Sequence, residues 1–194
     1  PMSRHQPAIL APLAPHGRHV TLDLITDADP RPALRALVKA IDPAQTVVGV
    51  GAALAAALER PVDGLRVFPA KSGPGFDVPS TPAALWLWLR GADRGALVHA
   101  GRRLEALLEE AFAVRDVVDT FVYEGGKDLS GYEDGTENPE GEAALDAAFS
   151  AADGLAGSSF AALQTWVHDL DALDDMTDRE RDHVIGRSRK TNEE

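Results

Sequence analysis

The sequence predicts an α+β protein in which a complete ferredoxin-like unit is followed by a second, incomplete one. Over residues 1–124, patterns of apolar residues occur in the order strand, helix, strand, strand, helix, strand. This is the βαββαβ arrangement of a ferredoxin-like unit, which has an antiparallel sheet with helices on one face. Residues 125–194 hold patterns for one further strand and short helices, and a lone strand cannot close a sheet. We therefore expect an N-terminal domain at 1–124 and the first part of a second domain at 125–194.

The first three elements are predicted from the spacing of apolar residues. Residues 19–25 alternate apolar and polar side chains, which is typical of a half-buried strand. An apolar face then recurs at helical spacing, at Leu34, Leu37, Val38 and Ile41. Asp42-Pro43 ends this helix, because the residue before a proline avoids the helical conformation. Residues 46–50 follow as a short buried strand.

The other three elements follow a segment rich in proline. Residues 61–82 carry five prolines, which predicts a loop. The run LWLWL at 85–89 fits a helix or a strand by periodicity alone, and we interpret it as a strand because it is short, aromatic and closed by Arg90-Gly91. A helix follows, with one apolar face at Leu97, Gly101, Leu104, Leu108 and Ala111. The β-branched and aromatic content of residues 117–123 predicts the last strand.

The second domain begins like the first but does not finish. A polar loop at 124–142 leads to a short helical segment at 143–149. Residues 159–169 alternate, which predicts a strand with one face formed by Phe160, Ala162, Gln164, Trp166 and His168. Thr177 and Glu180 form a capping box for a helix that ends at Gly186. Either a partner completes this unit or the sequence is part of a longer chain.

Composition excludes several classes of function. The chain has 194 residues and a formal charge of −12, and such an acidic surface repels the phosphates of nucleic acids. It has no cysteine, which excludes disulfides, zinc–thiolate sites, catalytic thiols and thiolate-bound haem. No apolar segment approaches the roughly 20 residues of a spanning helix, and the proline-broken N-terminal region does not form a secretory signal. We expect a cytoplasmic protein without a membrane or nucleic-acid partner.

The segment with the most chemical information is residues 125–139, GGKDLSGYEDGTENP. Each of these residues alone is typical of a solvated surface loop. Together, the spaced glycines suggest a backbone that approaches a ligand closely. Asp134 lies between Glu133 and Gly135 in this segment.

Residues 131–135, GYEDG, and the following TENP resemble the G-x-x-D-G signature of the dye-decolorizing peroxidases. The similarity extends over nearly the whole chain and is strongest to the bacterial, cytoplasmic type. It includes VPSTP at 78–82, LWLWLRG at 85–91, QTWVH at 164–168 and VIGR at 184–187.

The resemblance implies two ferredoxin-like halves with haem b in the second, and a haem peroxidase that uses hydrogen peroxide to oxidise dyes and phenolic compounds. Asp134 would be the distal acid–base residue, which takes a proton from the peroxide and returns it to the leaving oxygen. Gly135, Thr136 and Glu137 would lie against the haem. Arg187 either pairs with a haem propionate or is an exposed residue of a mixed-charge tail.

The chain departs from the family pattern in one respect. The family's proximal histidine and distal arginine lie downstream of the stretch that resembles residues 185–194, so neither is in this sequence. We assign neither His168 nor His183 as the iron ligand, and we predict no metal-ligating residue in the chain. The carboxylates of the 125–142 loop allow a calcium or manganese site as a rival interpretation, but their spacing does not follow an EF-hand.

Three hypotheses remain open. The first is a dye-decolorizing peroxidase with small aromatic reductants, whose physiological reductant the sequence does not reveal. The second is a haem-binding or haem-handling protein, and the third is a truncated or nicked fragment without activity of its own. The resemblance also implies a homo-oligomer, and the missing half of the haem site implies a complementary C-terminal fragment as another partner.

Overall fold

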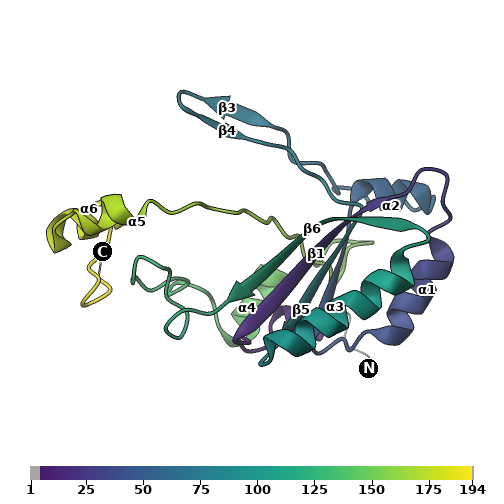
Figure 1. The fold of residues 1–194 in the computed structure, drawn as a ribbon, viewed down its shortest axis with the longest axis horizontal. Coiled ribbons are helices and arrows are strands. Elements are labelled where there is room, and N and C mark those ends of the chain that lie inside the picture. The colour runs from purple at the N-terminus through teal and green to yellow at the C-terminus, as the bar shows by residue number, and fades with distance from the viewer. Residues whose placement is uncertain (1–4, 194) are drawn as a thin grey trace. The chain divides into compact units, whose positions relative to one another are not determined.

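The computed structural model describes residues 5–193 and divides into two compact units (Figure 1). The first comprises Pro1–Phe121 and Phe149–Ser158, and the second comprises Val122–Ala148 and Ser159–Glu194. Residues 149–158 were not associated with the first unit by any sequence pattern. Within that unit the ring of Phe149 stacks on His5 at a centroid distance of 4.3 Å.

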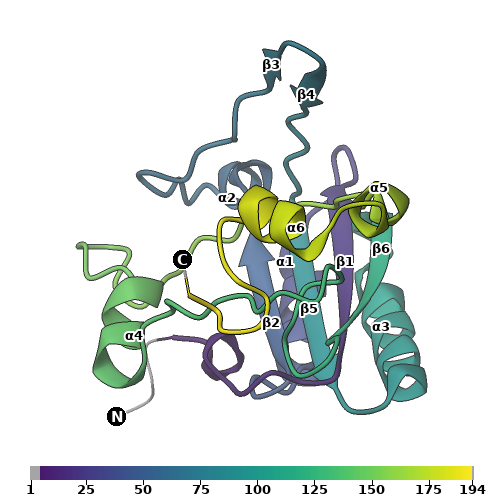
Figure 2. The same ribbon diagram turned by 90° about the vertical axis from the view of Figure 1, so that its left-hand side faces the viewer.

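The first unit is a ferredoxin-like fold, as the sequence predicts. Its four-stranded sheet has the order β2-β5-β1-β6, and every neighbouring pair is antiparallel. Helices α1 and α3 cover the same face of the sheet (Figures 1 and 2). The elements are β1 (His16–Leu24), α1 (Arg31–Ala40), β2 (Thr46–Val50), β5 (Leu85–Gly91), α3 (Arg94–Leu108) and β6 (Phe112–Phe121).

The core lies between this sheet and the two helices. Leu85, Leu87 and Leu89 point from β5 into it and are almost fully buried. They pack in one cluster with residues of β1 and of both helices, namely Val20, Leu22, Leu37, Leu97, Leu104 and Leu108. The LWLWL run is therefore a strand, as we interpreted it, because its alternate leucines fill the core while its tryptophans lie on the opposite face.

The opposite face carries an aromatic stack. The rings of His19, Trp86 and Trp88 contact one another in a triangle: the centroid of His19 lies 5.6 Å from that of Trp86 and 5.7 Å from that of Trp88, and the two tryptophans are 6.2 Å apart. Burial lowers the pKa of His19, and the Arg90 guanidinium lies 4.7 Å from the Trp88 ring. Three ring systems and a guanidinium thus cover the outer side of β5 and β1.

Arg90 also fixes the N-terminal segment to the sheet. It is 5% exposed and donates hydrogen bonds to the carbonyl oxygens of Ala8, Ala11 (3.0 Å) and Pro12 (2.6 Å). Ala8 belongs to the short 3₁₀ helix η1 (Pro7–Ile9). One side chain therefore provides the hydrogen-bond donors for three carbonyl groups of a segment that is otherwise irregular.

Replacement of Arg90 by Gln is expected to lower the free energy of unfolding by about 2–3 kcal/mol, because buried carbonyls lose charge-assisted donors. Urea unfolding followed by tryptophan fluorescence measures this change. Arg35→Gln is the matched control, since Arg35 is exposed on α1, and it should shift stability by no more than about 0.5 kcal/mol. Equal losses in the free energy of unfolding for the two substitutions would contradict the conclusion that Arg90 holds the N-terminal segment on the sheet.

The loop predicted at 61–82 contains a short hairpin, and a short helix precedes it. Helix α2 (Ala52–Ala57) is followed by a hairpin of β3 (Lys71–Gly73) and β4 (Phe76–Val78). The hairpin turns at Pro74-Gly75, where Gly75 has φ +83°. Proline followed by a glycine with positive φ is the preferred pair for a type II turn. The prolines thus shape a hairpin here as well as interrupting regular structure.

The second unit consists of loops and short helices. These are α4 (Gly141–Ala148), α5 (Leu170–Asp174) and α6 (Asp178–Ile185). The capping box on α6 is confirmed, and Gly186 ends the helix with φ +91°. Helix α5, capped by the Asp169 side chain, had not been predicted.

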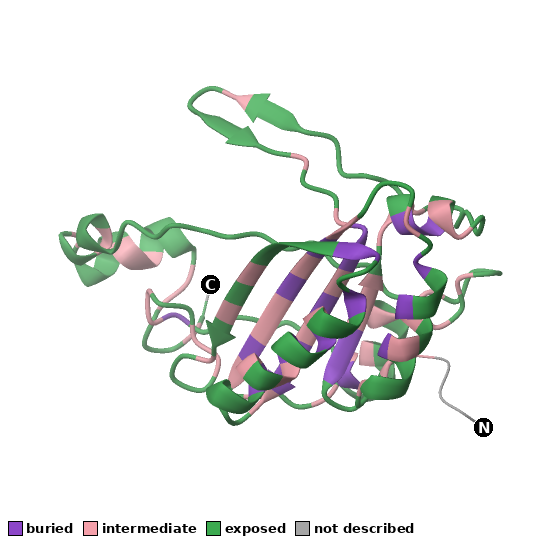
Figure 3. Cartoon of the chain, turned by 45° about the vertical axis from the view of Figure 1, so that its right-hand side comes forward, coloured by how far each residue is buried: buried purple, intermediate pink, exposed green. Residues whose placement is uncertain are grey.

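The predicted strand at 159–169 is wrong. These residues have no regular secondary structure and are exposed throughout (Figure 3). A strand forms only where a neighbouring strand satisfies its backbone groups, and the second unit contains only isolated bridges among its described residues. The alternation indicates which side chains would share one face of a strand, but it does not provide the neighbouring strand that the backbone needs for hydrogen bonding. None of the described helices is long and apolar enough to cross a membrane.

Candidate functional site

The loop that follows β6 is folded by its own backbone. Lys127 makes antiparallel bridges with Tyr123 and with Glu133, so the chain turns back on itself twice. Asp128 fastens the second turn. Its backbone N–H donates to the carbonyl of Tyr132 at 3.0 Å, and its carboxylate accepts from the backbone N–H of Ser130 at 2.6 Å. The glycine-rich sequence therefore forms a defined loop.

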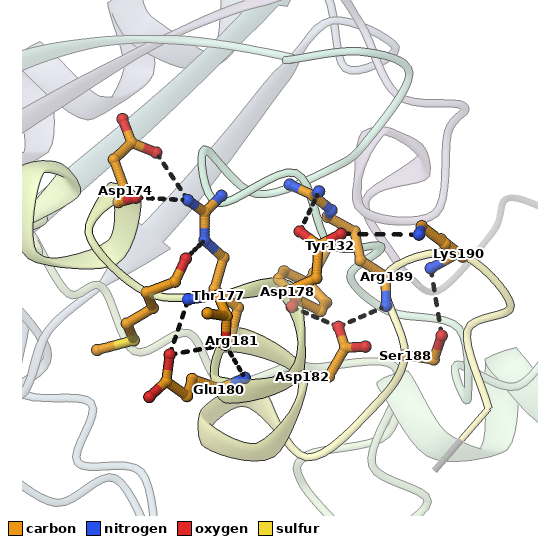
Figure 4. Close-up of polar contacts among 11 residues, drawn as sticks. Tyr132, Asp174, Thr177, Asp178, Glu180, Arg181, Asp182, Ser188, Arg189 and Lys190 are labelled. Carbon is orange, nitrogen blue, oxygen red and sulfur yellow. Dashed lines mark hydrogen bonds and ion pairs between the residues drawn. The ribbon is translucent and has the colours of Figure 1, made fainter.

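Asp134 lies exposed between two side chains that tie this loop to the C-terminal segment. Two residues before it, Tyr132 is 3% exposed, and its hydroxyl donates to the Asp182 carboxylate of α6 at 2.6 Å (Figure 4). Two residues after it, the Thr136 hydroxyl accepts from Arg187 Nη1 at 2.6 Å. We call these two contacts the loop tethers. They fix the backbone on both sides of Asp134.

The Tyr132–Asp182 contact changes the pKa of both partners. Burial, followed by the hydrogen bond to Asp182, raises the pKa of Tyr132 to about 12. The hydrogen bond from Tyr132 lowers the pKa of Asp182, as does the bond from the backbone N–H of Arg189, whose N···O distance is 3.0 Å. The contact is therefore made by a neutral phenol and an ionised carboxylate over the physiological range.

Tyr132 should ionise near pH 12 in the folded protein. Because this pKa is raised above its unfolded value of about 10, the contribution of Tyr132 to stability is complete below pH 10 and is lost as the pH rises through 12. Ultraviolet absorbance of phenolate follows the ionisation, and Tyr132→Phe identifies its component, since the chain has only two tyrosines. Ionisation near pH 10 with the fold intact would contradict a buried, bonded hydroxyl.

Helix α6 and the residues that follow it present the partners of both tethers. Its N-terminus is fixed by Thr177 and Glu180, and Arg181 bonds back to the carbonyls of Met176 at 3.1 Å and Asp174 at 2.9 Å (Figure 4). Its end at Gly186 places Arg187 directly after the helix, where Nη1 also donates to Asn192 at 3.1 Å. The surface ion pairs of this segment contribute little each, so the buried Tyr132 is its main anchor to the loop.

The structure brings some of the sequence-predicted site residues together. Thr136 and Arg187 are in contact, and Arg187 is half-buried. Asp134 and Glu137 are exposed. Gly135 has φ +69°, and a Cβ there would lie 2.6 Å from the Asn138 amide nitrogen. Each role assigned to these residues stays a prediction.

Tyr132 and Asp182 were not singled out as a pair by the sequence. They are separated by 50 positions, and the only signal was an aromatic residue inside a polar motif. Such a residue is a candidate for a buried anchor, because a loop of polar residues otherwise has nothing to bury.

The residues of the second unit fit one side of a haem site. Arg187 supplies a cation for a propionate, Asp134 supplies an exposed carboxylate, and exposed apolar side chains include Trp166, Val184 and Ile185. His168 and His183 are both exposed, and within residues 5–193 no group of three or more His, Asp or Glu side chains converges. That neither histidine is the axial ligand stays a prediction.

Comparison with known proteins extends the resemblance. Residues 125–194 match the family model described as "Dyp-type peroxidase, C-terminal". A dye-decolorizing peroxidase of Brevibacterium linens is 32% identical over 146 residues, which cover 73% of this chain and 40% of that protein. One of Mycobacterium tuberculosis is 30% identical over 197 residues, which cover 93% of this chain and 58% of that protein. The chain thus spans 40% and 58% of the lengths of these two relatives.

Solved structures show the same similarity at the level of the fold. A Dyp-type peroxidase protein of Shewanella oneidensis has a TM-score of 0.88 at 20% identity, over 100% of this chain and 68% of that one. A variant of DypB from Rhodococcus jostii RHA1, solved in complex with haem, has a TM-score of 0.78 at 26% identity, over 99% of this chain and 68% of that one. By sequence and by fold, the chain belongs to the dye-decolorizing peroxidase family.

Proposed function

We propose that the protein to which this chain belongs is a haem peroxidase that uses hydrogen peroxide to oxidise dyes and phenolic compounds. The observation that supports this function best is the position of Asp134 between the two loop tethers. An acid–base catalyst must be held within hydrogen-bond reach of the reacting oxygen. A carboxylate whose neighbours on both sides are fixed meets this requirement better than one on a free loop.

Asp134 would move one proton. Its carboxylate would accept the proton from one oxygen of hydrogen peroxide and return it to the other, which leaves as water. Haem b, when bound, supplies the iron and the redox equivalents for O–O cleavage and for oxidation of the reductant. The residues of this chain would bind and orient the haem, and Asp134 would transfer the proton.

The neighbouring residues would position the cofactor. Gly135, Thr136 and Glu137 lie directly after Asp134 and would line the haem face. Arg187 would place its positive charge on a propionate while it holds Thr136, since a guanidinium has several donors in a fixed plane. The half-buried position of Arg187 favours this role over that of a freely exposed side chain.

The axial ligand is proposed to come from outside the residues of this chain. Either further sequence of the same protein or a complementary C-terminal fragment would supply it. A homo-oligomer is part of the same proposal, and the cytoplasmic location stays a prediction.

The test is to bind haem to the complete protein and to follow oxidation of an anthraquinone dye with and without hydrogen peroxide. Peroxide-dependent turnover is the expected result. Haem binding with a normal Soret band but no turnover would overturn the peroxidase and favour the haem-handling hypothesis. If this chain alone binds haem and turns over dye, the proposed external ligand is wrong.

A further inference from the structure

The two edges of the four-stranded sheet differ in the side chains that they carry. Strand β6 forms one edge and β2 forms the other. Strand β6 contains three charged residues, Arg115, Asp116 and Asp119, whereas the five residues of β2 are TVVGV. Charged side chains on an edge strand oppose pairing with a strand of another chain. The β6 edge therefore carries its own protection against such pairing, and the side chains of β2 provide none.

The sequence around β2 makes an open edge here a risk for the protein. Residues 44–58 contain neither a charged residue nor a proline, and three of the five residues of β2 are valines. Short uncharged segments of high β-propensity without proline are those that pair into intermolecular sheets. Val50, the last residue of β2, is 47% exposed. Some other part of the fold must therefore cover the backbone of this edge.

The side chain of Gln6 covers it by imitating a neighbouring strand. The amide nitrogen of Gln6 donates to the carbonyl oxygen of Val48 at 2.8 Å, and its amide oxygen accepts from the backbone N–H of Val48 at 2.7 Å. Two residues that face each other in an antiparallel ladder exchange the same pair of hydrogen bonds. Val48 is the middle residue of β2. The central backbone groups on the outer side of this strand are therefore already bonded.

The segment that carries Gln6 is anchored at further points. Ala8 of η1 is completely buried. The Arg90 side chain donates to the carbonyl oxygens of Ala8 and of two residues that follow it. Arg90 belongs to β5, the strand that pairs with β2. Residues 6–12, which we call the clip, are therefore held by β5 as well as by β2.

We propose that the clip is an edge cap, which keeps β2 from pairing with a strand of another polypeptide. Gln6 makes the blocking contact, and Arg90 holds the clip in the position that allows it. The clip thus does for the uncharged β2 edge what charged side chains do for β6. The proposal does not depend on haem or on peroxidase activity.

Hydrogen exchange in Gln6→Ala tests the blocking contact. The backbone amide of Val48 should exchange at least about tenfold faster, because it loses its acceptor. The amide of Gly49 is the internal reference, since N–H groups alternate along a strand and this one points toward β5. Gln45→Ala is the matched control, because that side chain lies next to β2 but bonds to Asp42 at 3.1 Å. Unchanged exchange of Val48 in Gln6→Ala, or an equal increase in Gln45→Ala, would overturn the proposal.

Aggregation of the complete protein tests the protective role. Gln6→Ala should form β-rich, thioflavin-binding aggregates about tenfold faster than the unsubstituted protein, because the freed edge resembles the segments that pair into cross-β structure. Gln45→Ala should aggregate at the unsubstituted rate. Far-UV circular dichroism before the assay shows that the variants begin from the same fold.

A charge on the edge itself should replace the clip. Val50→Lys added to Gln6→Ala should return aggregation to the unsubstituted rate, since an edge lysine opposes strand pairing. Val38→Lys is the control for charge alone, because Val38 is 70% exposed on α1 and lies away from the edge. Rescue by Val50→Lys but not by Val38→Lys supports the edge cap. Equal effects of the two lysines, or a Gln6→Ala variant that does not aggregate faster, contradict it.

Discussion

Asp134→Asn is expected to lower peroxide-dependent dye oxidation by about 100- to 10,000-fold, the range for removal of a general acid–base group. Asparagine keeps the shape of the side chain but cannot take up the peroxide proton. The tethers join Tyr132 to Asp182 and Thr136 to Arg187 and do not use the Asp134 side chain, so the loop should keep its conformation. Steady-state kinetics of the haem-loaded complete protein measures the loss.

Glu133→Gln is the matched control for this prediction. It removes one carboxylate charge from the adjacent exposed position and should leave the rate within about twofold. An unchanged Soret band in Asp134→Asn would show that haem binding is preserved. Equal losses in Asp134→Asn and Glu133→Gln would mean that the charge of the loop matters, and the assignment of Asp134 as acid–base residue would fail.

Removal of both loop tethers is expected to lower kcat by about 100-fold, the effect of misplacing a catalytic group by about 1 Å. The double variant Tyr132→Phe/Thr136→Val deletes both hydroxyl groups and keeps the shape of both side chains. Asp134 would remain present but would no longer be held at one position. KM should change little, because the tethers do not touch the reductant.

This second prediction also has a readout without haem. Backbone amides of residues 133–138 should exchange with solvent faster in the double variant, because the tethers limit opening of the loop. Tyr123→Phe is the control, since it removes the same hydroxyl from a tyrosine whose side chain donates to its exposed neighbour Glu124 at 3.1 Å. Faster exchange without loss of kcat would separate the tethers from catalysis.

The elements of the first unit could be predicted because a local pattern of apolar residues identifies each of them, and all of them pack around one shared core. Alternation in β1 and β5 places Val20 and Leu87 in the core, and the helical spacing around Leu37 and Leu104 completes it. Each of these patterns has a single way to bury its apolar side, so local and global structure agree. The split βαβ order then leaves few possible topologies.

The hairpin, the coil at 159–169 and the Tyr132–Asp182 pair could not be predicted in this way. The hairpin depends on a two-residue turn within a proline-rich segment. The coil has the alternation of a strand, but within the described residues it has no neighbouring strand to bond with. Tyr132 and Asp182 meet only because α6 is placed beside the loop.

The sequence alone determined the fold of the first unit, the family resemblance and the motif around Asp134, because these depend on the order of residue types along the chain. Only the tertiary structure decided what holds Asp134 in place, that β3 and β4 pair as a hairpin, and that residues 159–169 have no strand partner among the described residues. These features depend on contacts between residues far apart in the sequence, such as Thr136 and Arg187. A pattern specifies which side chains share a face, whereas packing decides what that face meets.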